Sequence, residues 1–153
     1  MFAGTQETQL WSKDLGGAVA YPVIAGESIF VDVANAGPNG NMVYGSAVAA
    51  YDRRSGALQW GPNPIGGTYN FGALSYDAGT VFALNFDGQL YAFDAATGQQ
   101  RWMIRLPQEY AFTSPPTATN GTVYVGGSGS GGKLYAVDET TGGVDWIAGV
   151  MNR

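Results

Sequence analysis

The feature that most constrains the fold is a phrase that recurs along the chain and ends on tryptophan. Trp11, Trp60, Trp102 and Trp146 are separated by 49, 42 and 44 residues, and the last three each close a segment of the form A-x-D-x-x-x-G-x-x-x-W. Self-similarity at a period of this length is the signature of a repeat architecture, in which each repeat is one supersecondary unit. The chain is therefore predicted to consist of a series of such units.

The phrase selects four positions in each of three repeats, and each position has an expected structural role. Aspartate opens a turn and accepts hydrogen bonds from amides two or three residues on, and glycine supplies a positive φ. The small alanine leaves room for a large ring, and the tryptophan docks between neighbouring repeats. The residues are Ala50, Asp52, Gly56 and Trp60, then Ala92, Asp94, Gly98 and Trp102, and last Ala136, Asp138, Gly142 and Trp146.

Runs rich in β-formers precede each phrase and follow turn signals, at residues 28–31, 80–83 and 122–125. With these runs, each repeat is predicted to hold four strands, near 67–74, 80–84, 89–94 and 99–104 in the middle repeat. Units of 42 to 49 residues with four strands predict an all-β fold of four-stranded antiparallel β-propeller blades. We expect a partial propeller over 1–153, with blades near 12–60, 61–102 and 103–146. Residues 7–11 would be the leftover outer strand of a preceding blade.

The repeated phrase resembles the tryptophan-docking motif of quinoprotein-type propellers, the proteins built around pyrroloquinoline quinone (PQQ). The chain departs from the family after the motif glycine, where Ala57, Gln99 and Gly143 replace the frequent Lys or Glu. Closed propellers have about four to eight blades, so about three blades form an incomplete ring. The resemblance predicts either a fragment of a longer protein or an arc that assembles with a second copy of itself.

Composition excludes several kinds of chemistry. The chain has no Cys and no His, which removes disulfides, thiol nucleophiles and histidine acid–base catalysis. Its net charge of −5 disfavours nucleic-acid partners, because duplex binding needs clustered Lys and Arg. No apolar run approaches the ~20 residues of a membrane span, and residues 1–5 do not resemble a signal peptide. The expected location, extracellular or periplasmic, rests on the family resemblance.

A long irregular stretch at residues 34–45 is the main candidate for ligand contact. In an antiparallel meander it falls on the same face as 61–65 and 107–110, and Asn39, Asn41 and Tyr44 could contact a ligand there. The alternative is a tolerated surface insertion. The lone aspartates favour a turn role over calcium binding, which needs alternating oxygen ligands. The regular recurrence of tryptophan likewise favours packing over stacking on a quinone.

No catalytic residue, metal site or cofactor is predicted from these residues. The leading hypothesis is a non-catalytic PQQ-like repeat segment that acts as a scaffold, or as a ligand- or protein-binding surface, in a bacterial secreted or cell-surface protein. One alternative is a fragment of a PQQ-dependent alcohol or sugar dehydrogenase, which would use PQQ and calcium. Another is an assembly-factor or sensor propeller that binds a protein through its loop face. The expected partners are the remaining blades of a parent protein or a second copy of the chain, together with a protein or small-molecule ligand.

Overall fold

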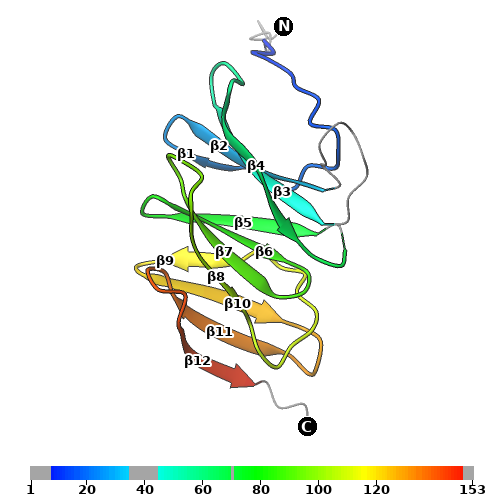
Figure 1. The fold of residues 1–153 in the computed structure, drawn as a ribbon, viewed down its shortest axis with the longest axis vertical. Coiled ribbons are helices and arrows are strands. Elements are labelled where there is room, and N and C mark those ends of the chain that lie inside the picture. Colours follow the sequence, from blue (N-terminus) through cyan, green and yellow to red (C-terminus); the bar gives the residue numbers. More distant parts are fainter. Residues whose placement is uncertain (1–7, 35–44, 70, 150–153) are drawn as a thin grey trace, which may run out of the picture.

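The computed structural model describes residues 8–34, 45–69 and 71–149, and these form three separate four-stranded antiparallel sheets (Figure 1). Within each sheet the strands neighbour one another in chain order. The first sheet holds β1 (Val23–Ala25), β2 (Ser28–Ala34), β3 (Ser46–Asp52) and β4 (Leu58–Gly66). The second holds β5 (Gly72–Asp77), β6 (Thr80–Asn85), β7 (Gln89–Asp94) and β8 (Gln100–Arg105). The third holds β9 (Thr117–Thr119), β10 (Thr122–Gly127), β11 (Lys133–Asp138) and β12 (Val144–Gly149).

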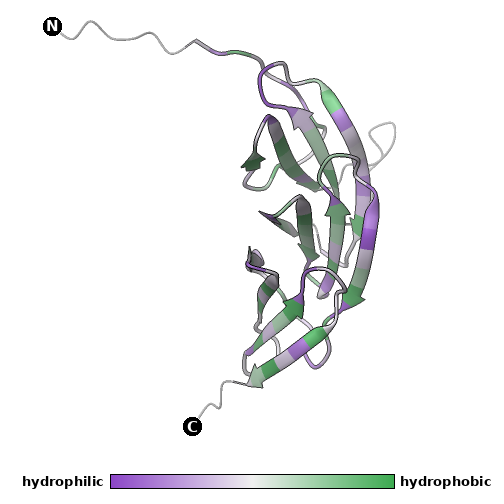
Figure 2. Ribbon diagram, turned by 90° about the vertical axis from the view of Figure 1, so that its left-hand side faces the viewer, coloured by the Kyte–Doolittle hydropathy of each residue, from purple (hydrophilic) through white to green (hydrophobic). Residues whose placement is uncertain are grey.

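The three sheets stack face to face as an open arc, which confirms the predicted all-β fold of incomplete propeller type. Figure 2 shows the arc from the side, with the inner strands β1, β5 and β9 along the concave edge and the outer strands β4, β8 and β12 along the convex edge. Within the described residues, no helix is long and apolar enough to span a membrane.

Burial differs between the middle and the last sheet because only the middle one is covered on both faces. Every residue of β6 is buried, whereas β10 alternates between buried and more exposed positions. A strand with one solvated face shows this alternation, and a strand buried on both faces does not.

The innermost strand of the middle sheet begins later than predicted. It was expected near residues 67–74 and is found as β5, Gly72–Asp77. Gly66, the last residue of β4, and Gly67 have φ angles of +65° and +105°, outside the range of regular β-strands, so the chain turns there before a new strand can begin. The connector instead turns so that Thr68 N donates to Asp87 Oδ2 at 2.8 Å.

The core lies between the sheets rather than inside any one of them. One cluster joins the first and second sheets and includes Phe30, Trp60, Leu74 and Phe93. A second joins the second and third sheets and includes Phe82, Leu90, Phe112 and Tyr135. A sheet with apolar residues on both faces is stable only when another layer covers each face, so neighbouring blades stabilise one another.

Candidate functional site

The three aspartates of the repeated phrase each close the same turn. Asp52 Oδ1 accepts hydrogen bonds from Arg54 N and Ser55 N at 2.9 and 2.8 Å. In the other two sheets, Asp94 and Asp138 accept hydrogen bonds from the equivalent amides, two and three residues further along the chain. Hydrogen bonds from these turns lower the pKa of Asp52 and of Asp138, and for Asp94 the Arg101 side chain is the largest cause.

The motif glycines and tryptophans meet across the joints, always in the same direction along the chain. Trp60 Nε1 donates to the carbonyl of Ala95 at 2.8 Å, and Trp102 Nε1 donates to that of Glu139 at 2.8 Å. Each indole also lies over the glycine of the same turn. A Cβ at Gly98 would fall 2.5 Å from the Trp60 ring, and one at Gly142 would fall 2.7 Å from the Trp102 ring.

Trp11 makes the same contact although it precedes the first sheet. Its Nε1 donates to Arg53 O at 3.0 Å, and its ring lies over Gly56, where a Cβ would come within 2.8 Å. Residues 8–11, expected as an outer strand, belong to no strand in the structure. The indole therefore docks on the first turn without a sheet of its own.

Each motif alanine lies directly opposite the tryptophan of its own sheet. The registered pairs are Ala50 with Trp60, Ala92 with Trp102 and Ala136 with Trp146. Trp146 differs from the others because 45% of its surface is exposed, and Leu134 and Tyr124 are exposed around it. It is the last indole of the described arc.

The structure treats the three stretches predicted to form a ligand face differently. Asn39, Asn41 and Tyr44 lie outside the described residues. Residues 61–65 are not a loop as predicted but part of β4, where Ile65 is buried and Asn63 Nδ2 donates to Gly98 O at 2.8 Å. Both prolines of this stretch lie on an outermost strand, where a missing amide is tolerated.

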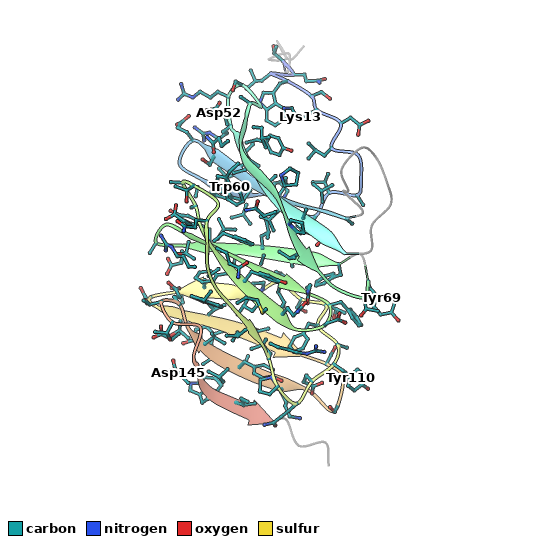
Figure 3. All side chains as sticks on the ribbon, in the orientation of Figure 1. Lys13, Asp52, Trp60, Tyr69, Tyr110 and Asp145 are labelled. Carbon is teal, nitrogen blue, oxygen red and sulfur yellow. The ribbon has the colours of Figure 1, made fainter. Side chains whose placement is uncertain are left out.

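The connector at 107–110 packs on the glycine-rich loop of the third sheet. Buried Glu109 accepts a hydrogen bond from Ser130 N at 2.6 Å and pairs with Lys133 at 3.6 Å. Tyr110, by contrast, is 67% exposed. Figure 3 places Tyr69 and Tyr110 at one edge of the arc, opposite the edge that carries the Asp52 turn.

A cavity of about 700 Å³ lies where the inner segments of all three sheets converge. Its walls come from residues 18–23 beside β1, from Asp32 and Ala34 on β2, from 71–74 at the start of β5, and from Thr113 and Pro115 ahead of β9. Cavities of about 300–1,000 Å³ with mostly apolar walls and few polar groups are typical of small-molecule sites.

Asp32 is the one acidic residue in the described wall of this cavity, and it is almost completely buried, with 1% of its surface exposed. Its Oδ2 lies where a Cβ on Gly72 would come within 2.1 Å, so only glycine fits opposite it. Its Oδ1 has no hydrogen-bond partner among the described residues. Burial raises the pKa of Asp32 to about 6, and the nearby Ser46 hydroxyl lowers it to a smaller extent.

The sequence reasoning missed Asp32, although the repeat contained a signal. Asp32 lies two residues after Phe30 on β2, just as Leu84 lies two residues after Phe82 on β6. Leu84 is fully buried in the joint between the second and third sheets. Asp32 thus places a carboxyl where the neighbouring repeat has a core leucine. Buried acids with raised pKa in a cleft are candidates for function.

Among known proteins, the chain is similar to quinone-dependent dehydrogenases. It is 32% identical over 118 residues to the quinohemoprotein alcohol dehydrogenase ADH-IIG of Pseudomonas putida, which covers 66% of this chain and 16% of that protein. It is 34% identical over 124 residues to the dehydrogenase subunit of the alcohol dehydrogenase (quinone) of Komagataeibacter europaeus, covering 66% and 17%. The chain therefore spans about a sixth of the length of these relatives.

Solved structures agree on the fold. A europium-containing methanol dehydrogenase superposes with a TM-score of 0.75 at 25% identity, covering 94% of this chain and 27% of that one. BamB from Moraxella catarrhalis superposes with a TM-score of 0.60 at 20% identity, covering 82% and 34%. The family profile PQQ_2, outer membrane protein assembly factor BamB, matches residues 44–151. Since this match spans more than half of the sequence, the chain belongs to the PQQ_2 family of β-propeller repeats.

Proposed function

We propose that this chain is a non-catalytic propeller segment that acts as a rigid binding scaffold and presents the cavity beside Asp32 to a small-molecule ligand. We further propose that the parent protein is a bacterial secreted or cell-surface protein, located in the periplasm or outside the cell. The observation that carries the proposal is the convergence of three sheets on one largely apolar cavity that contains a single buried carboxyl.

The joints support a scaffold role because they make the position of each sheet depend on its neighbour. Each described joint combines an indole hydrogen bond of 2.8 Å with a buried apolar cluster. A site assembled from several elements needs such support to hold its geometry.

The cavity does not fit PQQ. The family resemblance implies cationic contacts for the carboxylates of this quinone, whereas the described wall contains Asp32 and no Lys or Arg. A buried anion beside Asp32 would add like-charge repulsion in a poorly solvated site. Within the described residues, no three His, Cys, Asp or Glu side chains group as a metal site.

The test is ligand-observed NMR of the chain with 1-butanol, butylammonium and butyrate as probes. Ala20→Trp and Thr113→Trp fill the cavity from two different walls. We expect saturation transfer to at least one probe in the natural chain and its loss in both variants. Gln99→Trp, an added indole on an exposed turn, is the matched control and should keep the signal. Equal signals in all four proteins would refute a ligand site in this cavity.

The names of the relatives favour a second candidate, a fragment of a PQQ-dependent alcohol or sugar dehydrogenase. Its test is a titration of the chain with PQQ in the presence of calcium. Saturable quenching of tryptophan fluorescence that requires calcium would favour this candidate over the scaffold. Unchanged fluorescence would disfavour it for this segment.

We also propose that the exposed face around Trp146 packs against a further blade of the same repeat type, either in the parent protein or in a second copy of the chain. The row Tyr124, Ala136 and Trp146 matches the rows Phe30–Ala50–Trp60 and Phe82–Ala92–Trp102, which face the two described joints. Light scattering distinguishes the two sources, since a discrete dimer supports the second copy and a monomer supports the parent protein.

A further inference from the structure

We infer that the cavity selects a small organic cation, a short-chain alkylammonium, and that the carboxylate of Asp32 is its counter-ion. This inference rests on the proposed function, in which the cavity is a ligand site. It adds the charge and chemical class of the ligand and the residue that recognises them.

The hydrogen-bonding capacity of the Asp32 carboxyl is only partly met. Its carboxyl is buried, and its Oδ1 has no partner among the described residues. A buried carboxylate is strongly destabilising unless it is paired with a cation or with hydrogen-bond donors. The equivalent position of the next repeat is the buried Leu84. A leucine at position 32 would avoid the cost of burying a carboxylate, yet the first joint has Asp32.

Most of the described basic side chains contact groups other than Asp32. Arg53 and Arg54 pair with Glu27, Arg101 pairs with Asp94, and Lys133 pairs with Glu109. Lys13 lies over the Tyr51 ring, which belongs to the cluster on the opposite face of the first sheet. Arg105 is exposed at the end of β8, and the described wall of the cavity contains no Lys or Arg. A positive charge for Asp32 is therefore expected from a ligand.

The shape and polarity of the cavity favour an organic cation over a metal ion. Divalent cations such as calcium require six to eight oxygen ligands, and the described wall offers one carboxyl. Val23, Phe71, Leu74 and Pro115 contribute apolar surface that suits an alkyl chain. A short-chain alkylammonium matches both features, since its ammonium group can pair with the carboxylate and its alkyl chain can contact the apolar side chains.

A ligand can reach the carboxyl along one edge of the first sheet. The segment 18–20 closes the edge of β2 beside Asp32 and is attached by two backbone hydrogen bonds, Ala20 N to Asp32 O at 3.0 Å and Ala34 N to Ala18 O at 2.8 Å. The adjoining Tyr21 is 94% exposed. Val19 and Val33 form a single isolated β-bridge there rather than a longer ladder. A segment at the margin of a sheet opens at smaller cost than the core strands, so we expect the ammonium to enter along this edge.

The experiment is isothermal titration of the full chain with n-butylammonium chloride at pH 7.5, with 1-butanol and calcium chloride as separate titrants. We expect saturable butylammonium binding that weakens at least tenfold in Asp32→Asn and at least tenfold at pH 4.5, where the carboxyl is protonated. 1-Butanol should bind at least tenfold more weakly. Asp145→Asn removes one exposed negative charge on β12 and should leave binding unchanged.

Each contrary result has a distinct meaning. If 1-butanol binds as well as butylammonium, or if Asp32→Asn binds butylammonium unchanged, the cation inference is wrong. Loss of both probes in Ala20→Trp and Thr113→Trp would still support the ligand site. Calcium binding that depends on Asp32, without amine binding, would replace the organic cation by a metal ion. If no probe distinguishes the filled cavities from the natural chain, the proposed function fails together with the inference.

Discussion

The two ends of the arc carry the same kind of sheet but cover it differently. At the first sheet, Leu15 packs against an outer cluster of Val31, Val33, Ala49 and Tyr51, and Trp11 docks on the Asp52 turn. At the third sheet, Trp146 holds the position that Trp60 holds in the first sheet. Trp146 is 45% exposed, whereas Trp60, which lies in the first joint, is 7% exposed. The difference shows that the repeat is directional. Each turn receives the indole of the preceding segment, and each indole is buried only by the segment that follows.

The largest expected effect is at the joint between the first and second sheets. Trp60→Ala should destabilise the chain by ~3–5 kcal/mol, because it removes a buried ring and leaves a cavity. Trp146→Ala, the same change at the exposed end, should cost less than ~1 kcal/mol. Chemical denaturation of both variants measures the contrast. Equal losses would mean that burial by the following turn does not determine the contribution of an indole.

The glycine beneath the docked ring should have the next largest effect. Gly98→Ala should cost about 2–4 kcal/mol, since the new Cβ meets the Trp60 ring and the residue has a φ of +76°. Gly79→Ala is the matched control, with a φ of +84° and open space around it, and should cost about 1–2 kcal/mol. The difference in unfolding free energy isolates the contact with the ring. No difference would show that the ring moves aside freely.

The buried acid should make the first joint sensitive to pH. Because its pKa rises from 3.8 to about 6 on folding, Asp32 binds a proton more tightly in the folded chain, and stability falls as pH rises from about 4 to 6. Relative to the natural chain, Asp32→Asn should gain about 2–3 kcal/mol between pH 4 and pH 8. Glu139, whose pKa is raised to about 7 by burial and by Asp77, affects both proteins alike. Parallel stability curves would show that Asp32 ionises as readily in the folded chain as in the unfolded one.

The smallest expected loss of stability is at the first sheet, where Trp11 docks on the Asp52 turn. Trp11→Ala should cost about 1–2 kcal/mol, because the indole docks on the turn without a sheet behind it. Leu10→Ala is the control next to it, with 78% of its surface exposed, and should change stability by less than ~0.5 kcal/mol. Thermal unfolding of the two variants tests this. A Trp11 variant as stable as the control would show that the first turn does not need a docked ring.

The blades could be predicted from the sequence because their signals are local. The Asp94 carboxylate binds amides two and three residues away, and Gly98 N bonds to Asp94 O within the same turn. Alternation along β7 and the glycine turns on either side indicate the hairpins in the same way. Interactions that span a few residues leave their pattern in adjacent letters of the sequence.

The candidate site could not be predicted in this way, because it joins segments that are far apart along the chain. Asp32 faces Gly72, forty residues on, and shares the cavity with Pro115. The sequence by itself determined the repeat, the turns and the four-stranded units. Only the tertiary structure decided which turn receives each indole, which end of the arc stays exposed, and that a carboxyl is buried at the concave edge. Burial and the resulting pKa depend on neighbours brought together by stacking of the sheets, and that stacking is not encoded in any one repeat.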